Sequence, residues 1–357
     1  MKGYENQLTS ASIVTRYAIM NVTEACACAA MLFGKVSRHV SDHRLILLVI
    51  LFNTVAVGMR GLVSLLADRA VRSRHSGVRL GVLLFTLGFL WPVELGITLK
   101  VVLAAVGSAV YHAFSTSTVQ AKSTFRASGM GFLSAGAALG TAFGRYAAFY
   151  GYLSIILFMI LACPTDKCCD LPEAKENRLK RAPKTPFSPL FVLLLTIAAG
   201  ALSYAVSSLD LPWDVNRRTM LLIALAITLG RGLGGVVTDL LGNAVALAFS
   251  LGGGTACLLF CGDGKLLSLA GIVLIAMASA PLLSLLFRCM PCHPGFSVSL
   301  AAGAAYLGYV ALKFFPPRDG IFPLICGVVL LITAGADLLL SLTGRRAPAG
   351  KEVAERV

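Results

Sequence analysis

Long apolar runs, separated by short polar segments, dominate the sequence. A helix needs about 20 mostly apolar residues to cross the hydrocarbon core of a bilayer. Cut at charges, prolines and glycine-rich turns, the runs predict spans at residues 17–34, 45–66, 79–95, 98–115, 127–146, 148–163, 189–209, 219–240, 243–261, 266–287, 295–313 and 321–343. The pattern predicts an all-α integral membrane protein with about twelve transmembrane helices. A count of ten or eleven helices is also possible, because several of the predicted connections are only a few residues long.

One interior stretch has the composition of a linker. It reads CPTDKCCDLPEAKENRLKRAPKTPFSP and combines prolines and both charge signs with almost no apolar periodicity. The linker separates six predicted spans from six. We therefore expect a helical bundle at residues 1–163, a cytoplasmic linker at 164–188, a second bundle at 189–344 and a cytoplasmic tail at 345–357.

Two phrases occur once in each half. RGLVSLLAD at residues 60–68 returns as RGLGGVVTD at 231–239, and SAGAALG at 134–140 returns as AAGAAYLG at 301–308. The two pairs have nearly the same offset in the sequence. This indicates duplicated halves in the same orientation, the parallel repeat of one large class of transporters.

Composition supports a membrane location. The chain is 57% hydrophobic and 13% charged, against about 25% charged in an average soluble domain. The net charge of +14 would suggest nucleic acid for a soluble protein, but basic loops that face anionic lipid explain it better here. The basic segments favour cytoplasmic termini, so we expect a multi-pass protein of the plasma (inner) membrane that binds no nucleic acid.

The repeated phrases also carry a family resemblance. SLLADRAVRSR, residues 64–74, resembles the signature of the loop between helices two and three in the major facilitator superfamily, and GGVVTDLLG, residues 234–242, resembles its second-half copy. Ser64 and Val71 stand where that signature has glycine. The resemblance implies two six-helix bundles that rock around a central cavity and move a small molecule by alternating access.

A further stretch resembles a narrower group. Residues 107–144, GSAVYHAFSTSTVQAKSTFRASGMGFLSAGAALGTAFG, are similar to the fourth and fifth spans of drug exporters of the fosmidomycin-resistance type. Ala113 stands where that group commonly has proline. This resemblance implies export of a small organic molecule coupled to proton entry.

The first signature suggests a cytoplasmic gate at Asp68, Arg69 and Arg72, with Asp239 at the matching place in the second half. An aspartate at a helix end can accept hydrogen bonds from a neighbouring helix terminus and from arginines. The alternative is that these charges only set the topology from a solvated loop.

Glu24 lies well inside the first predicted span. A charged side chain at the bilayer centre costs roughly 2.5 to 3.5 kcal/mol on insertion scales, so this carboxylate should face a cavity, find a partner or hold a proton. Glu24 is the first candidate for proton coupling. Alternatively, Asn21 and Thr23 could hydrogen-bond it as a structural contact.

Three further residues complete the predicted cavity. Arg60 and Arg231 lie eight residues before their aspartates, where an arginine can either reach the headgroups or turn inward to pair with Glu24 or bind an anion. His112 could relay protons, because imidazole changes charge near neutral pH, or it could be a simple polar contact.

The sequence carries no phosphate-binding loop, GxSxG elbow or HExxH motif. We therefore predict that it is not an enzyme and that it uses no metal ion or cofactor. Its expected partners are a small-molecule substrate, protons and lipid, and its expected state is a monomer. The alternative is a sensor or scaffold on a degenerate transporter fold. Convergence of Glu24, Arg60 and His112 on one polar cavity would favour the carrier.

Overall fold

The described residues form helices joined by short turns and contain no strand. The computed structural model describes residues 2–69, 74–122, 127–146, 148–163, 189–209, 211, 213–214, 216–260, 264–290, 293–315 and 321–342. The predicted linker, 164–188, and tail, 345–357, lie outside this part of the chain, and so does Arg72.

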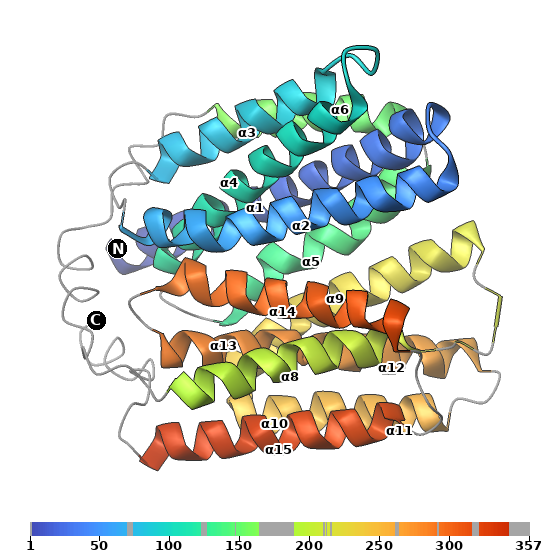
Figure 1. Ribbon diagram of the computed structural model, residues 1–357. Coiled ribbons are helices and arrows are strands. Elements are labelled where there is room, and N and C mark those ends of the chain that lie inside the picture. The colour runs from blue at the N-terminus through green and yellow to red at the C-terminus, as the bar shows by residue number, and fades with distance from the viewer. Residues whose placement is uncertain are drawn as a thin grey trace.

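The helices of the first half run back and forth across the bundle (Figure 1). Their bounds are α1 (Lys2–Ala29), α2 (Asp42–Arg69), α3 (Arg74–Leu90), α4 (Ile97–Lys122), α5 (Ala127–Tyr146) and α6 (Ala148–Ala162). A π-helical segment, η1 (Ala30–Lys35), and a 3-10 turn, η2 (Val36–Arg38), continue α1. We call the end of the bundle where α1 begins and α2 ends the base.

The helices of the second half follow the same plan, with two spans broken into pieces. Their bounds are α8 (Pro189–Ser207), α9 (Arg217–Leu241), α10 (Asn243–Leu247), η5 (Ala248–Gly253), α11 (Gly254–Leu259), α12 (Lys265–Met277), α13 (Ser279–Cys289), α14 (Pro294–Phe314) and α15 (Ile321–Leu342). The break between α12 and α13 falls three residues before Pro281. That proline has no backbone N–H to donate to the preceding turn.

Eight helical segments of the described chain are long and apolar enough to cross a membrane, and two shorter apolar segments, 149–162 and 243–259, accompany them. The helices α3 and α5 are in neither group. The structure therefore supports a multi-pass, all-helical membrane protein, whereas length and hydropathy alone do not establish twelve crossings.

Apolar side chains cover much of the outer surface. On α15, Leu324, Leu331 and Leu338 are 66%, 74% and 59% exposed, and their seven-residue spacing places them along one face of the helix. A soluble protein rarely leaves such a continuous apolar face open to water. In a bilayer this face contacts lipid.

The apolar interior forms two clusters, one made mostly of first-half residues and one made of second-half residues. In the first half, the rings of Tyr111 and Phe158 meet edge to face with centroids 4.9 Å apart, and Phe85 contacts Phe158 in the same way at 5.9 Å. In the second half, Leu195, Leu251 and Val329 belong to a separate cluster. Two cores of this kind agree with two bundles packed side by side.

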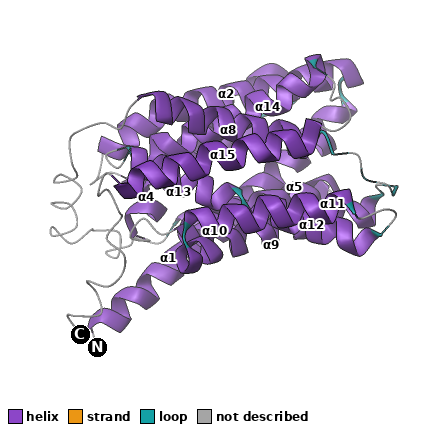
Figure 2. Cartoon of the chain, turned by 90° about the horizontal axis from the view of Figure 1, so that it is seen from below, coloured by secondary structure: helices purple, strands orange, loops and turns teal. Residues whose placement is uncertain are grey.

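The two halves meet through matching pairs of helices. The helix α2 packs against α14, and α5 packs against α9 (Figure 1). The second view shows the same bundle from below, with helices throughout (Figure 2). At the α5–α9 crossing, a Cβ atom added to Gly235 would come within 2.6 Å of the Ser128 Cα atom. The backbones approach so closely there that only glycine fits.

The third span ends earlier than the sequence predicted. We expected residues 79–95, but α3 begins at Arg74 and ends at Leu90, because the residue before a proline disfavours helical backbone and Pro92 follows. The free carbonyls at this helix end accept hydrogen bonds from Lys100. Its Nζ donates to the oxygens of Gly88 at 3.2 Å and Trp91 at 2.8 Å.

Candidate functional site

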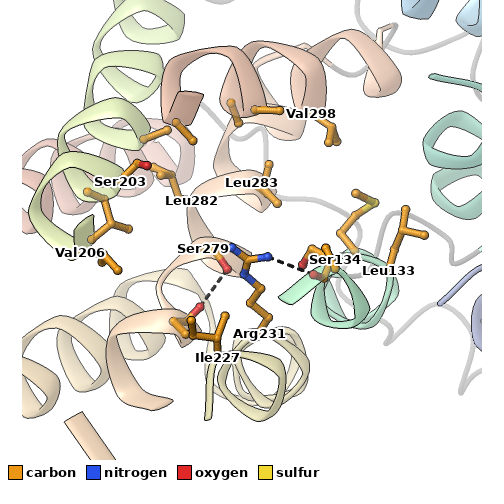
Figure 3. Close-up of a pocket in the computed structure, with 18 of the residues that line it drawn as sticks. Leu133, Ser134, Ser203, Val206, Ile227, Arg231, Ser279, Leu282, Leu283 and Val298 are labelled. Carbon is orange, nitrogen blue, oxygen red and sulfur yellow. Dashed lines mark hydrogen bonds between the residues drawn. The ribbon is translucent and has the colours of Figure 1, made fainter. Parts of the chain in front are cut away.

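A cavity of about 500 Å³ lies between the two halves. The first half contributes polar side chains from four helices to its wall, namely Asn21 of α1, Arg60 of α2, His112 of α4 and Ser134 of α5. The second half contributes mainly alkyl groups, with Arg231 and a few hydroxyls among them (Figure 3). A cavity of this size matches the 300 to 1,000 Å³ typical of small-molecule sites.

Glu24 lies directly behind the cavity wall. Its side chain is buried, Ser108 Oγ donates a hydrogen bond to Glu24 Oε1 at 2.6 Å, and His112 Nε2 lies 3.4 Å from Glu24 Oε2. His112 itself lines the cavity. A protonated imidazole would form an ion pair with this carboxylate, so the charge of Glu24 reaches the cavity through His112.

Asn21 and Thr23, the expected structural partners of Glu24, bond backbone carbonyls instead. Asn21 Nδ2 donates to the carbonyl oxygen of Leu133, and Thr23 Oγ1 donates to that of Met20 at 2.8 Å. Neither side chain bonds the Glu24 carboxylate. Its partners come from α4 instead.

Arg60 lines the cavity, so it is directed into the bundle. Its Nη2 donates to Thr116 Oγ1 at 3.1 Å, while its Nε is buried without a hydrogen-bond partner. The positive charge of Arg60 interacts with the negative charge of Glu24. Glu24, His112 and Arg60 therefore form one electrostatic cluster on the first-half side of the cavity.

Arg231 occupies the matching place in the second half and also points into the cavity (Figure 3). Its Nη1 donates to the carbonyl oxygen of Ser134 on α5 at 3.1 Å. Ser134 opens the repeated SAGAALG phrase. Two conspicuous features of the sequence thus contact each other across the interface between the halves.

The signature aspartate of the first half caps a helix of the second. Asp68 Oδ1 accepts from the Gly295 backbone N–H at 3.0 Å, and Asp68 Oδ2 accepts from that of Phe296 at 3.1 Å. Ser117 Oγ donates to Asp68 Oδ1 at 2.8 Å. A carboxylate at a helix N-terminus satisfies free N–H groups and faces the positive end of the helix dipole.

Asp239, the aspartate of the second signature, caps a helix of the first half. Asp239 Oδ1 accepts from the backbone N–H of Ala127 at 2.9 Å, and Asp239 Oδ2 accepts from that of Ser128 at 3.0 Å. These residues begin α5 of the first half. Each half therefore caps one helix of the other, and the contacts join the halves at the base.

A further side-chain hydrogen bond joins the two halves. Ser64 on α2 and Ser299 on α14 share a hydrogen bond between their hydroxyls at 2.7 Å. Ser64 is the residue that replaces glycine in the first signature. The departure from the family pattern thus supplies an additional bond between the halves.

The predicted arginines of the gate contribute less than the aspartates. Arg69 is exposed and has no hydrogen bond or ion pair in the described part of the chain. Arg74 Nη2 donates to the backbone oxygen of Asp68 at 3.5 Å. Arg72 lies outside the described residues.

Sequence reasoning missed the polar face of α4. Ser108, His112 and Thr116 follow each other at intervals of four residues, which places them along one face of a helix. This four-residue spacing is visible in the sequence and could have predicted all three residues, but the prediction named only His112. The face holds the direct partners of both Glu24 and Arg60.

A second charged cluster lies apart from the cavity. Arg288 Nη1 and Asp337 Oδ1 form an ion pair at 2.5 Å between α13 and α15, and Asn243 Nδ2 donates to Asp337 Oδ1 at 3.4 Å. Asp337 is therefore part of the packing of the second half. Across the described residues, no group of three or more His, Cys, Asp or Glu side chains could hold a metal ion.

Comparisons with known proteins support the fold. The sequence matches no protein-family model, and no curated protein matches it. Among solved structures, the chain is similar to the major facilitator superfamily transporter FucP in the outward conformation, with a TM-score of 0.62 and 12% identity over 92% of this chain and 98% of that one. A variant of the E. coli fucose:proton symporter FucP gives the same TM-score and identity over 93% and 99%. The fold is thus that of a major facilitator superfamily transporter, and the narrower resemblance to fosmidomycin-resistance exporters gains no support.

Proposed function

We propose that this chain is a secondary active transporter that moves a small organic molecule by alternating access and couples this movement to protons. The observation that carries the proposal is the contact between Glu24 and His112 at the wall of the cavity between the halves. A scaffold would have no need of a buried carboxylate whose partner lines such a cavity, because intramembrane ionisable groups are costly.

The proton step follows from the cluster around Glu24. The ionised carboxylate attracts Arg60 and, once the imidazole is protonated, His112. Addition of a proton to Glu24 removes its charge and both attractions. His112 and Arg60 are then free to adopt other positions at the cavity wall, which makes the site sensitive to protonation.

The proposed gate consists of the two helix caps at the base, which are made by Asp68 and Asp239. With Asp68 and Asp239 bonded to helix starts of the opposite halves, the base is closed. Opening the base requires α14 to leave Asp68 and α5 to leave Asp239. Alternating access then consists of breaking and remaking these contacts while the opposite end of the bundle closes or opens.

The remaining expectations belong to the same proposal. We infer twelve spans in two six-helix bundles, at residues 1–163 and 189–344, with the base, the linker 164–188 and both termini on the cytoplasmic side of the plasma (inner) membrane. The protein works as a monomer in lipid and is not an enzyme. The closed base would then correspond to a state directed away from the cytoplasm.

Two versions of the mechanism are possible, and they differ in the direction in which the substrate is transported. The resemblance of residues 107–144 implies export in exchange for protons, whereas one solved structure of similar fold is that of a fucose:proton symporter. Both versions use Glu24 in the same way. They differ in whether an inward proton gradient drives the substrate out of or into the cell.

A ligand screen followed by a flux assay tests the proposal. Purified protein and its Glu24→Gln variant are screened by thermal shift between about pH 5 and pH 8, since a ligand that binds the folded state raises the melting temperature. Hits are then tested in liposomes that contain a pH-sensitive dye. We expect hits whose addition moves protons in the parent protein and not in the variant.

The control is Ser108→Ala, which removes one hydrogen bond to Glu24 and keeps the carboxylate. We expect this variant to keep proton movement. Ligand flux that is equal with and without a pH gradient would exclude proton coupling. A screen without hits, together with identical melting of parent and Glu24→Gln at every pH, would favour the scaffold.

A further inference from the structure

The two repeated arginines have different electrostatic surroundings. Arg60 and Arg231 stand 171 residues apart at the same place in the repeated phrase, and both line the cavity. Arg60 interacts with the charge of Glu24. Arg231 has no comparable carboxylate.

The groups that face Arg231 come from the helices packed against α9. From α5 the carbonyl oxygen of Ser134 accepts the one hydrogen bond that the Arg231 side chain donates within the described residues, and from α13 the hydroxyl of Ser279 lies nearby (Figure 3). The Ser279 hydroxyl donates to the carbonyl oxygen of Ala276 at 2.9 Å. Among the described residues that line the cavity there is no aspartate or glutamate.

Arg231 therefore brings a full positive charge to a wall that contains nothing to neutralise it. A guanidinium offers five N–H donors in a planar fork, and only one of them is used by Ser134. Arg231 is partly exposed and lines the cavity, and a positive charge in such a largely apolar wall lacks the counterion that would stabilise it. The fork has the geometry to bind two oxygens of an anion side by side.

The surroundings of Arg231 are otherwise apolar. The cavity wall near it carries Ile227, Leu282 and Leu283, and across the cavity α8 contributes Val206 and the hydroxyl of Ser203 (Figure 3). An anionic group at Arg231 would leave the rest of a ligand in contact with these side chains. Such a site selects molecules with one charged end and a compact apolar body.

We propose that Arg231 binds the anionic group of the transported substrate, and that this substrate is a small organic anion with an apolar body. The inference rests on the proposed transport function. It assigns different tasks to the two matched arginines. Arg60 belongs to the proton-sensitive cluster with Glu24, and Arg231 supplies the positive charge that recognises the substrate.

The test uses three probes with the same ring and different charge: cyclohexanecarboxylate, cyclohexanecarboxamide and cyclohexylmethylammonium. Binding to purified protein is measured by thermal shift and by calorimetry. We expect the carboxylate to bind at least about tenfold more tightly than the other two, because charge-assisted hydrogen bonds are worth more than neutral ones.

Substitutions at Arg231 test the assignment. Arg231→Gln should weaken carboxylate binding by about tenfold or more and leave the amide unchanged, while Arg231→Lys should retain part of the preference because the charge remains. The control is Arg145→Gln. It removes the same charge from an exposed arginine that lies over the Phe33 ring, outside the cavity wall.

Three results would overturn the proposal: equal binding of amide and carboxylate, no binding of the carboxylate, or an undiminished carboxylate preference in Arg231→Gln. Melting of each variant without ligand shows whether it is folded. If Arg231→Gln does not fold, the carboxylate preference of Arg231→Lys is the test, and an undiminished preference there would overturn the proposal. Carboxylate binding without any flux in liposomes would reject the transport function and leave the anion site standing.

Discussion

Asp68 and Asp239, which stand 171 residues apart, each accept two backbone hydrogen bonds from the start of a helix in the opposite half. The groups that they cap are of the same kind, because Gly295 and Phe296 lie in the first turn of α14, and Ala127 and Ser128 lie in the first turn of α5. The hydrogen bonds that join the halves at the base are therefore reciprocal, since each half supplies one aspartate and one helix start.

Asp68→Asn should loosen the start of α14. Asparagine has one acceptor oxygen where aspartate has two and carries no charge for the helix dipole, so we expect a loss of about 0.5 to 2 kcal/mol. Hydrogen exchange followed by mass spectrometry should show faster exchange in the first turn of α14. Asp239→Asn is the matched control, with faster exchange at the start of α5. Unchanged exchange in both variants would contradict the caps as closing contacts.

Glu24→Gln and His112→Gln should both reduce the dependence of stability on pH. The contact at 3.4 Å becomes an ion pair only when the carboxylate is ionised and the imidazole is protonated, and either change removes one charge. Melting temperatures between about pH 5 and pH 8 should therefore vary less in each variant than in the parent protein. The double variant should resemble the single ones, because the pair acts as one unit. Additive effects would show that the two side chains contribute to stability independently.

Gly235→Ala should disturb the contact between the halves. An added Cβ atom would meet backbone atoms of Ala127 and Ser128 at 2.7 Å and 2.6 Å, and overpacking of this kind costs about 1 to 3 kcal/mol. We expect a lower melting temperature and faster exchange at the start of α5. Gly232→Ala, on the same helix, meets only the Phe132 ring at 3.6 Å and should be tolerated. Equal effects of the two changes would mean that the close approach does not limit packing.

Arg288→Met should destabilise the second half. The change leaves Asp337 with the weaker contact to Asn243 at 3.4 Å, and removal of one partner of a largely buried ion pair costs about 3 to 5 kcal/mol. Thermal unfolding of the detergent-solubilised protein would measure the loss. The double change Arg288→Met with Asp337→Leu should recover most of it, because no unpaired charge remains. A single variant as stable as the parent protein would show that water replaces the arginine.

Local patterns in the sequence determined the helices, the membrane character and the repeat. Apolar runs fix where a helix can cross a bilayer, because the backbone must satisfy its own hydrogen bonds there. One of the differences from the prediction, the early end of α3, also has a local cause, since Pro92 stops a helix that hydropathy alone would extend. Glu24, Arg60, His112 and Arg231 could be named as candidates because each is a polar group within an apolar run.

Only the tertiary structure decided which groups these residues contact. Nothing in the spacing of the chain says that Asp68 meets Gly295, that Ser108 and His112 reach Glu24 from α4, or that Arg231 faces the cavity without a carboxylate. Such contacts join residues far apart in the sequence, and they form only when whole helices pack at particular angles and depths. The sequence determines which residues are charged. Packing determines whether an oppositely charged neighbour lies close enough to neutralise each of them.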